Sequence, residues 1–516
     1  MRVVLHRRWA VALGSLAIVV LTVVCYNFLG TDLLPEMDEG GFILDYYTPP
    51  GSSLAESDRI LQNIEKILRS VPEVENTSRR TGMQLGLIAV TEANRGDFTV
   101  KLKQNRSRDI EEIMDDVRQQ VEKSQPGTQV EFIQVLQDMI GDLTSAPEPI
   151  VIKLFSQDAQ QLNNVAPRVA DAIQKVPGVV DVLDGIQNTI SGPAVTFKVD
   201  PITAARSGFT PEEVSTDATA ILEGAEAAAP VILNNRAYQI RVRMPEQDRA
   251  SLERMQNTLL TSTSGRTATL GTLSTITRDP GQTEIRRENL QRLVEVTGRL
   301  EGVDLGRGVT EVKKAVADLH LPSSIRVEYG GTYEEQQKSF ADLLGVLILA
   351  LLLLFVVLLF EFRNFSAPIA ILASALLSTF GAFVALLITR TTFNVASFMG
   401  MIMVIGIVAK NGILLLDAEH RYRALGFSAE ESMIQAGRRR LRPIAMTALA
   451  AIAGMLPLAF HLHMTSKKCP IGAGSQMLQP LAIVVVGGLL SSMVLSLVVT
   501  PAVNFYLHPA NEKAAD

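Results

Sequence analysis

The 516-residue sequence has little of what disulfide-stabilised proteins and most enzymes need. It contains two cysteines, six histidines and one tryptophan, and aromatic residues make up only 5% of it. Cys25 lies in a long apolar run, so we expect no disulfide framework. The sequence also lacks a Walker loop, an HExxH motif and a GxSxG motif. These absences argue against an enzyme that uses a nucleotide, a zinc ion or a serine nucleophile.

Charge and hydropathy indicate a membrane protein with a large water-soluble part. The formal net charge of −6 argues against a nucleic-acid partner. Hydrophobic residues make up 47% of the chain and charged residues 20%, with a mean hydropathy of +0.21. A soluble protein of this length is less apolar, and a protein made only of membrane spans is less charged. We therefore expect both kinds of region in one chain.

Six apolar stretches are long enough to cross a bilayer, which takes about 20 helical residues. They are Trp9–Leu29, Leu343–Phe360, Phe365–Thr389, Thr391–Leu416, Pro443–Phe460 and a segment within Pro480–Leu507. The first follows the basic stretch MRVVLHRR, but its apolar run is too long for a signal peptide, and no small-x-small cleavage site follows it. We interpret it as an uncleaved span.

The positions of the arginines predict the orientation in the membrane. Three arginines precede the first span, and six lie between Arg421 and Arg442, in an expected loop of about 25 residues. Short loops rich in Lys and Arg stay in the cytoplasm. We therefore expect both chain termini in the cytoplasm and residues 30–340 outside it. The basic run GRRRLRP is interpreted as a topology signal and not as a nucleic-acid site.

The external segment alternates between strand-like and helix-like stretches. It begins with an expected strand at Gly41–Pro49 and a helix after Ser53, whose spacing to Glu56 is that of a capping box. A strand at Asp97–Lys103, a second helix and a further strand follow. A second central strand near QLGLIAV would complete a ferredoxin-like β-α-β-β-α-β unit.

An internal repeat predicts a second unit of the same kind. IEKILRSVPEV (Ile64–Val74) aligns with VADAIQKVPGV (Val169–Val179), 105 positions later. In both segments a helix ends, a Val-Pro turn follows and a strand begins. The closing half of the second unit comes late, at LQRLVEVTGRL, a helix near Val309–Leu319 and SIRVEYGG.

An insertion, roughly residues 185–281, separates the two halves of the second unit. Within it, Thr210, Pro211 and Glu213 have the spacing that begins a helix, and the strands AYQIRVRM and TATLGTLSTI follow. The expected fold is an α+β membrane protein with six transmembrane helices and two ferredoxin-like units that carry an inserted subdomain. Its expected segments are a first span (1–30), a first unit (31–147), two halves of a second unit (148–184 and 282–335), the insertion (185–281), a five-helix bundle (336–508) and a tail (509–516).

Four motifs follow one another along the chain in a recognisable order. They are LLPEMDEGGFILDYYTPPGSSLAES after the first span, GIVAKNGILLLDA in the fourth, RRRLRPIAMTALAAIAGMLPLA entering the fifth and GAGSQMLQPLAIVVVGGLLSS entering the sixth. With the layout of spans and external domain, they resemble a resistance-nodulation-division (RND) efflux permease, specifically its C-terminal half. The resemblance covers nearly the whole chain.

The resemblance implies a trimeric permease in the inner membrane of a Gram-negative bacterium, with its large domain in the periplasm. Such permeases export substrates from the periplasm or the membrane and are driven by the proton-motive force, without a bound cofactor. They work with a periplasmic adaptor and an outer-membrane channel. The two ferredoxin-like units would be porter subdomains, and the insertion would be the docking subdomain that faces the channel.

The fourth span carries a lysine, Lys410, at membrane depth. A charge in hydrocarbon costs at least about 2.5–3.5 kcal/mol, so Lys410 is a functional candidate, with snorkelling to the headgroups as the alternative. In the resembled family the matching lysine lies among titrating carboxylates, and Arg440 and Thr447 occupy the positions of further proton-relay members. Without the family, Arg440 is an ordinary interfacial arginine and Thr447 a hydroxyl bonded to its own helix.

The acidic side of such a relay is missing from the six apolar runs, which contain no Asp or Glu. The nearest carboxylate in sequence is Asp417, seven residues after Lys410 and about 10 Å along a helix. Whole RND permeases are about twice this length and consist of two similar halves, a repeat logic common among transporters. Either a companion chain supplies the first half or the chain is a fragment of a longer or broken gene. We expect the chain alone not to transport.

Two substrate classes compete. Amphiphilic organic compounds are our main interpretation, because the AKNG context is closer to the drug-type branch, and heavy-metal cations are the alternative. A metal route needs thiolate, thioether or imidazole ligands, whereas the methionines of the external domain are scattered and indicate packing. One loop, FHLHMTSKKCP, clusters four candidate metal ligands: His461, His463, Met464 and Cys469.

A membrane sensor or an assembly scaffold without transport is the competing class of function. A sensor would usually append a cytoplasmic signalling domain. The expected cytoplasmic parts here are short: a basic tail, one loop and the segment HPANEKAAD. The sequence therefore favours a transporter.

Overall fold

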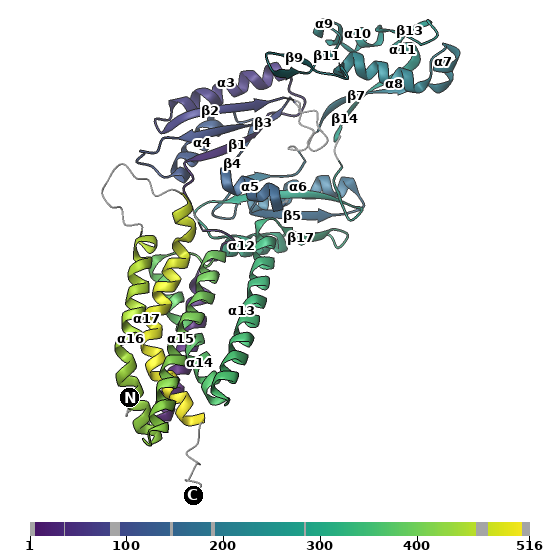
Figure 1. Ribbon diagram of the computed structural model, residues 1–516. Coiled ribbons are helices and arrows are strands. Elements are labelled where there is room, and N and C mark those ends of the chain that lie inside the picture. The colour runs from purple at the N-terminus through teal and green to yellow at the C-terminus, as the bar shows by residue number, and fades with distance from the viewer. Residues whose placement is uncertain are drawn as a thin grey trace. The chain divides into compact units, whose positions relative to one another are not determined.

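The computed structural model describes residues 6–35, 37–82, 93–144, 148–186, 191–282, 285–460 and 473–507. By their contacts the residues divide into two compact units. One unit comprises Met1–Asn188 and Arg286–Asp516, and the other comprises Thr189–Ile285. The first unit holds the long helices and two larger sheets, and the second holds short helices and two-stranded sheets (Figure 1).

Within the described residues, six helices of the first unit are long and apolar enough to span a membrane. They are α2 (Arg8–Phe28), α13 (Thr332–Phe362), α14 (Ser366–Thr389), α15 (Val395–Ala424), α16 (Ala429–Ala459) and α17 (Ala473–Leu507). The helices run side by side, with α14 and α17 in the most extensive contact (Figure 1). These two approach closely because a Cβ on Gly487 would lie 2.4 Å from the carbonyl oxygen of Gly381.

Two of these helices extend well beyond the apolar runs that predict them. Helix α13 begins at Thr332, although its apolar run begins only at Leu343, and α16 begins at Ala429 and continues through Pro443. The expected loop between the fourth and fifth spans is therefore only Leu425–Ser428. Helical hydrogen bonds continue through polar residues outside the hydrocarbon, and Pro443 removes only one of them.

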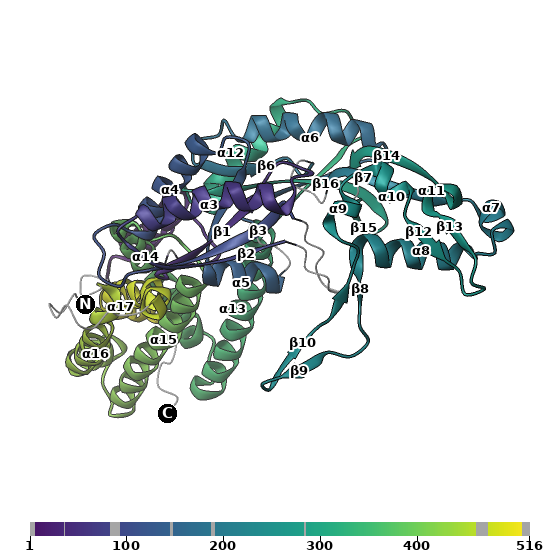
Figure 2. The same ribbon diagram turned by 90° about the horizontal axis from the view of Figure 1, so that it is seen from above.

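The first sheet has the β-α-β-β-α-β element order of a ferredoxin-like unit. Its elements are β1 (Gly41–Tyr47), α3 (Leu54–Ser70), β2 (Val74–Thr81), β3 (Arg95–Leu102), α4 (Ile110–Ser124) and β4 (Gln129–Gln134). The strands are antiparallel in the order β2-β3-β1-β4, and α3 and α4 pack on one face of the sheet (Figure 2). QLGLIAV, expected to be a central strand, lies outside the described residues, and β2 precedes it.

Only half of the expected capping box forms at the start of α3. The hydroxyl of Ser53 accepts a hydrogen bond from the Glu56 N–H, 3.2 Å away. The Glu56 carboxylate does not return to Ser53 but accepts from Arg59, with 2.8 Å between Nε and Oε2. An ion pair with the next turn has replaced the second bond of the box.

The second sheet is assembled from two stretches of chain separated by the second unit. Its elements are β5 (Ile150–Phe155), α6 (Ala159–Ile173), β6 (Val179–Leu183), β15 (Arg287–Glu288), β16 (Gln291–Leu300), α12 (Leu305–Asp318) and β17 (Arg326–Gly330). The strand order is β15-β16-β5-β17, with β6 also paired to β16. Helices α6 and α12 contribute to its apolar core. A short helix, α5 (Val135–Thr144), leads from the first sheet towards the second.

The second unit consists of short elements. They are β7 (Ser191–Val199), α7 (Pro201–Arg206), α8 (Pro211–Thr219), a π-helical turn (Ala220–Gly224), β8 (Ala225–Glu226), β9 (Val231–Leu233), β10 (Arg236–Tyr238), β11 (Arg241–Val242), α9 (Glu246–Arg249), α10 (Leu252–Gln256), β12 (Leu259–Thr261), β13 (Thr267–Thr269), α11 (Leu270–Leu273) and β14 (Ser274–Gln282). The capping box of Thr210 and Glu213 at α8 is confirmed. The strand expected over TATLGTLSTI is interrupted by α11, because Leu270 and Leu273 are buried on one side of a helical turn.

Candidate functional site

Lys410 lies on α15, and the start of this helix is fixed by a buried capping box. The Ser397 N–H donates to Asn394 Oδ1 at 3.0 Å, and the Asn394 N–H donates to Ser397 Oγ at 2.7 Å. Both side chains are fully buried. The two reciprocal bonds satisfy main-chain donors at the helix start and fix the residue at which α15 begins.

One face of α15 is left open by the other described helices. Met399, Met403, Gly406 and Lys410 recur at helical spacing and are all exposed. Met399 is 50% exposed and Met403 44%, and no described atom lies within 4 Å of a Cβ placed on Gly406. We call these four residues the lysine face. The opposite side of the helix, which includes Val404 and Val408, is buried in the helix bundle.

Lys410 has no acidic partner in the part of the chain that the structure describes. Asp417, the nearest carboxylate in sequence, is engaged elsewhere. Its Oδ2 lies 3.0 Å from Arg421 Nη2 and 3.8 Å from Arg440 Nη2. The lysine face therefore presents a cation that the described part of the chain does not neutralise.

The structure brings Arg440 to Asp417 but does not bring Thr447 to Lys410. Arg440 and Thr447 both lie on α16. The Thr447 hydroxyl donates to the carbonyl oxygen of Ile444 in its own helix, at 3.0 Å. The three sequence-predicted relay residues thus share two adjacent helices without forming one hydrogen-bonded chain.

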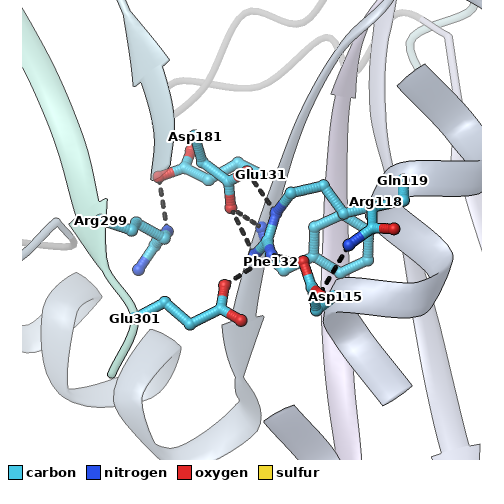
Figure 3. Close-up of polar contacts among 8 residues, drawn as sticks. All are labelled: Asp115, Arg118, Gln119, Glu131, Phe132, Asp181, Arg299 and Glu301. Atoms are coloured by element: carbon cyan, nitrogen blue, oxygen red, sulfur yellow. Dashed lines mark hydrogen bonds and ion pairs between the residues drawn. The ribbon is translucent and has the colours of Figure 1, made fainter. Parts of the chain in front are cut away.

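A second candidate site joins the two sheets of the first unit by buried ion pairs (Figure 3). Arg118 on α4 binds Asp181 on β6, with 2.8 Å between Nε and Oδ1, and Glu301 after β16, with 2.6 Å between Nη1 and Oε2. Arg299 on β16 pairs with Glu131 on β4, with 2.7 Å between Nε and Oε1. We call these five residues the inter-sheet network.

The network is tightly enclosed. The side chains of Arg118 and Arg299 are both 8% exposed. The guanidinium of Arg118 also lies over the Phe132 ring, 5.0 Å from its centre, and Asp181 accepts from the Phe132 N–H at 3.0 Å. Buried charges of this kind are stable only when they are paired and hydrogen-bonded, and Arg118 and Asp181 meet both conditions.

Burial raises the pKa of several carboxyl groups around the network. The pKa of Asp45 rises to about 7, mainly by burial and further by the charge of Glu131. The pKa of Glu148 also rises to about 7, again by burial and then by Glu131. Burial raises the pKa of Glu131 itself, against the pull of Arg299. Asp45 and Glu148 therefore change charge near neutral pH, where an exposed Asp or Glu stays ionised.

Two cavities adjoin this contact between the sheets. One of about 180 Å³ is lined from both sheets, by Met114, Arg118 and Phe132 on one side and by Arg299, Leu300 and Val303 on the other. Another of about 560 Å³ shares Asp181 and is also lined by three further acidic residues, Glu122, Asp171 and Asp184. The first cavity suits a small partly apolar molecule, whereas one of the four acidic residues of the second, Asp181, is already paired with Arg118.

The structure supplies no metal centre among the residues it describes. In that part of the chain, no group of three or more His, Cys, Asp and Glu side chains could hold a metal ion. The candidate ligands His461, His463, Met464 and Cys469 lie in residues 461–472, outside the described residues. The metal loop therefore stays a prediction from sequence.

Sequence reasoning missed the inter-sheet network. Arg118 is separated from Asp181 by 63 positions and from Glu301 by 183, so no local spacing connects them. One signal was available: Arg118 lies on the apolar stripe of α4, one position after the buried Val117, where a cation needs partners. The half-exposed Asp115, one turn before Arg118 on the same helix, also contacts it, with 3.4 Å between Oδ1 and Nη1.

Comparison with known proteins gives one family and several relatives. The model of the AcrB/AcrD/AcrF family matches residues 1–508. The chain is 29% identical over 511 residues to the cobalt-zinc-cadmium resistance protein CzcA of Cupriavidus metallidurans, covering 96% of this chain and 47% of CzcA. It is 26% identical over 506 residues to the multidrug resistance protein MdtC of Erwinia tasmaniensis, covering 97% of this chain and 47% of MdtC.

A solved structure has the same fold as this chain, and the chain again matches about half of it. The crystal structure of a heavy metal efflux pump superposes with a TM-score of 0.78 at 29% sequence identity, and the match covers 98% of this chain and 51% of the pump. The chain thus spans about half the length of the curated relatives that it matches.

Proposed function

We propose that this chain, which belongs to the AcrB/AcrD/AcrF family of RND efflux permeases, is the C-terminal half of a proton-driven exporter. In this proposal a companion half supplies the acidic residues that face Lys410. The complete permease would work as a trimer in the bacterial inner membrane, with a periplasmic adaptor and an outer-membrane channel. The cytoplasmic termini and the periplasmic position of the two sheets belong to the same proposal.

The open lysine face is the observation that carries this proposal. A cation at membrane depth is costly, and such residues almost always face a bundle interior or a water-filled cavity. Lys410 is exposed on a helix whose other side is packed, beside two exposed methionines and a glycine. A second bundle that covered this face would bury all four residues and bring an acid to the lysine.

The chemistry of such a pair would couple protons to movement. A nearby lysine favours the charged form of a carboxyl group, and protonation of that carboxyl removes the attraction. The position of α15 would then have two states, one for each state of the pair. Arg440 on α16 and Asp417, two turns after Lys410 on α15, form an ion pair that would hold these two helices together.

Heavy-metal cations are the substrate class that we propose, ahead of the organic compounds expected from the sequence. The similarity to CzcA and to a heavy metal efflux pump supports metals. Organic amphiphiles are the second candidate, supported by the similarity to MdtC and by the apolar lining of the smaller cavity.

Reconstitution in liposomes tests the half-permease proposal. With an imposed proton gradient, we expect no export by the purified chain alone, and export when a companion half with membrane carboxylates is co-reconstituted. Proton-dependent export by the chain alone would contradict the proposal, because the described residues offer Lys410 no acid.

Calorimetric titration of the chain with zinc, copper(I) and silver tests the substrate class. We expect stoichiometric binding of at least one cation. The variant with alanine at His461, His463, Met464 and Cys469 tests the loop, because it would abolish binding only if the loop holds the metal. Absence of binding by all three cations would favour organic substrates.

A further inference from the structure

Residues Gly30–Leu33, which follow the C-cap residue Leu29 of α2, are bonded to the segment that leads into α15. The Phe393 N–H donates to the Gly30 carbonyl at 2.8 Å, and the Asp32 N–H donates to the Phe393 carbonyl at 3.1 Å. The Val395 N–H donates to the Leu33 carbonyl at 3.3 Å. We call Gly30–Leu33 the connector. It is attached, by main-chain hydrogen bonds, to the capped end of the helix that carries Lys410.

The connector is bonded equally closely to the start of α12. Asp32 Oδ1 accepts from the Leu305 N–H at 2.8 Å, and the Thr31 carbonyl accepts from the Gly306 N–H at 3.0 Å. The Thr31 N–H donates to Asp304 Oδ1, the cap of α12, at 3.1 Å. The first N–H groups of a helix have no acceptor within the helix, and here the connector supplies acceptors for those of Leu305 and Gly306.

The contact between the connector and α12 leaves no space for an added side-chain atom. A Cβ on Gly306 would lie 2.2 Å from Thr31 Oγ1, and a Cβ on Gly30 would lie 2.7 Å from Asp304 Cγ. Thr31 is β-branched and therefore stiff about its first torsion. The connector and the start of α12 must consequently move together.

On the membrane side, Phe393 holds the connector to four helices. Its ring centre lies 6.1 Å from that of Tyr26 on α2, 5.6 Å from Phe340 on α13, 5.5 Å from Phe383 on α14 and 5.7 Å from Phe398 on α15. Phe393 is only 4% exposed. Such aromatic pairs add to the stability that burial provides. Phe393 therefore links the main chain of the connector to the packing of the bundle.

We propose that the connector is the joint that transmits movement of the lysine helix to the second sheet. Helix α12 packs Val309 and Val312 into the core of that sheet. Strand β16 of the same sheet carries Arg299, and Glu301 follows it, so the joint leads from α15 to the inter-sheet network. The inference rests on the proposed function in one respect, namely that a change at Lys410 is what moves α15.

Coupling free energies between two sites are reciprocal, so the joint can be tested from both ends in the chain itself. The first test is hydrogen exchange in detergent of Phe393→Ala, with Phe398→Ala as the matched control. Both remove a buried ring of the same aromatic cluster, but only Phe393 is bonded to the connector. We expect the Leu305 and Gly306 amides to exchange about tenfold faster in Phe393→Ala and less than about twofold faster in Phe398→Ala.

The second test starts at α12 and uses variants with a small structural change. Gly306→Ala directs a methyl group at Thr31, whereas Gly308→Ala directs one at Leu300 on β16, 2.5 Å from Cδ2. We expect the Phe393 and Val395 amides to exchange about tenfold faster in Gly306→Ala alone. Equal effects of the two alanines, or of the two phenylalanine deletions, would show general loosening and overturn the inference.

Neither exchange experiment requires transport, so the inference can fail while the proposed function holds. A third measurement connects the two in the assembled permease. There we expect Gly306→Ala to reduce export at least about tenfold relative to Gly308→Ala. Export that depends on Lys410 but is equal in the two alanine variants would overturn the joint and leave the half-permease proposal intact.

Discussion

The inter-sheet network and the lysine face place charges in low-dielectric surroundings in opposite ways. In the network the chain supplies both signs: Arg118 binds Asp181 and Glu301, and Arg299 binds Glu131. On the lysine face it supplies only the cation. The two regions belong to the same unit of the chain, and the same cost of an unpaired charge applies to both.

The difference indicates which of the two regions has all of its charge partners within this chain. A matched network holds two sheets together without outside help. An unmatched lysine on an open face requires a partner that the described residues do not contain, and the match to only half of each relative points to where that partner would come from. Substitutions should therefore act on stability in the network and on transport at the lysine face.

The largest effect on stability is expected for Arg118→Ala. The substitution leaves Asp181 and Glu301 buried or partly buried without their cation, and removal of one partner from a buried pair costs about 3–5 kcal/mol. Local opening free energies from hydrogen exchange of β4 and β16 would measure it. Arg59→Ala is the matched control, because the Arg59–Glu56 pair is exposed and water screens its attraction. A loss no larger than the control's would mean that the network does not hold the sheets.

A change of pH is expected to have an intermediate effect on the stability of the contact between the two sheets. Asp45 and Glu148 have pKa values raised by burial to about 7. A carboxyl group whose pKa is higher in the folded protein stabilises the fold while protonated, and that contribution is lost as pH rises through the folded pKa. The contact between the sheets should therefore open more readily at about pH 9 than at about pH 5.

Variants sharpen this pH prediction. Asp45→Asn and Glu148→Gln imitate the protonated groups and should flatten the pH dependence of amide exchange between the two sheets. Glu56→Gln is the control, because Glu56 is exposed and its pKa is lowered by Arg59. Glu56→Gln should leave the change in amide exchange around neutral pH as it is in the unmodified protein. If amide exchange depended on pH in the same way in the double variant Asp45→Asn/Glu148→Gln, the assignment of the pH dependence to these two carboxyl groups would be contradicted.

The smallest effect on stability is expected for Lys410→Met in the chain alone. The ammonium has no partner among the described residues, so its removal breaks no ion pair. The free energy of unfolding should therefore not fall, because the substitution removes an unpaired charge from low-dielectric surroundings, where such a charge is costly. A loss of several kcal/mol in denaturant unfolding would show that Lys410 already has a structural role within this half.

The sequence predicted features that depend on local spacing or on hydropathy. The capping box of Thr210 and Glu213 is an example, because both of its bonds join residues three positions apart. Hydropathy located the membrane helices but not their ends. Helix α13 extends from Leu343 back to Thr332, because polar residues continue a helix outside the hydrocarbon.

Long-range contacts were not predictable from one sequence. The connector joins Thr31 to Asp304, 273 positions away, and nothing in either neighbourhood indicates the other. Lys410 was found because a charge at membrane depth is conspicuous in sequence. Its exposure depends on how the other helices pack, which a single sequence does not fix.

Export by the assembled permease with Lys410→Met is the measurement that tests the central claim most directly. The variant keeps the length of the side chain and removes its charge, and Lys314→Met, an exposed lysine of α12, is the control. We expect proton-driven export to fall at least about a hundredfold in Lys410→Met and to stay unchanged in the control. Unchanged export in Lys410→Met would contradict the account.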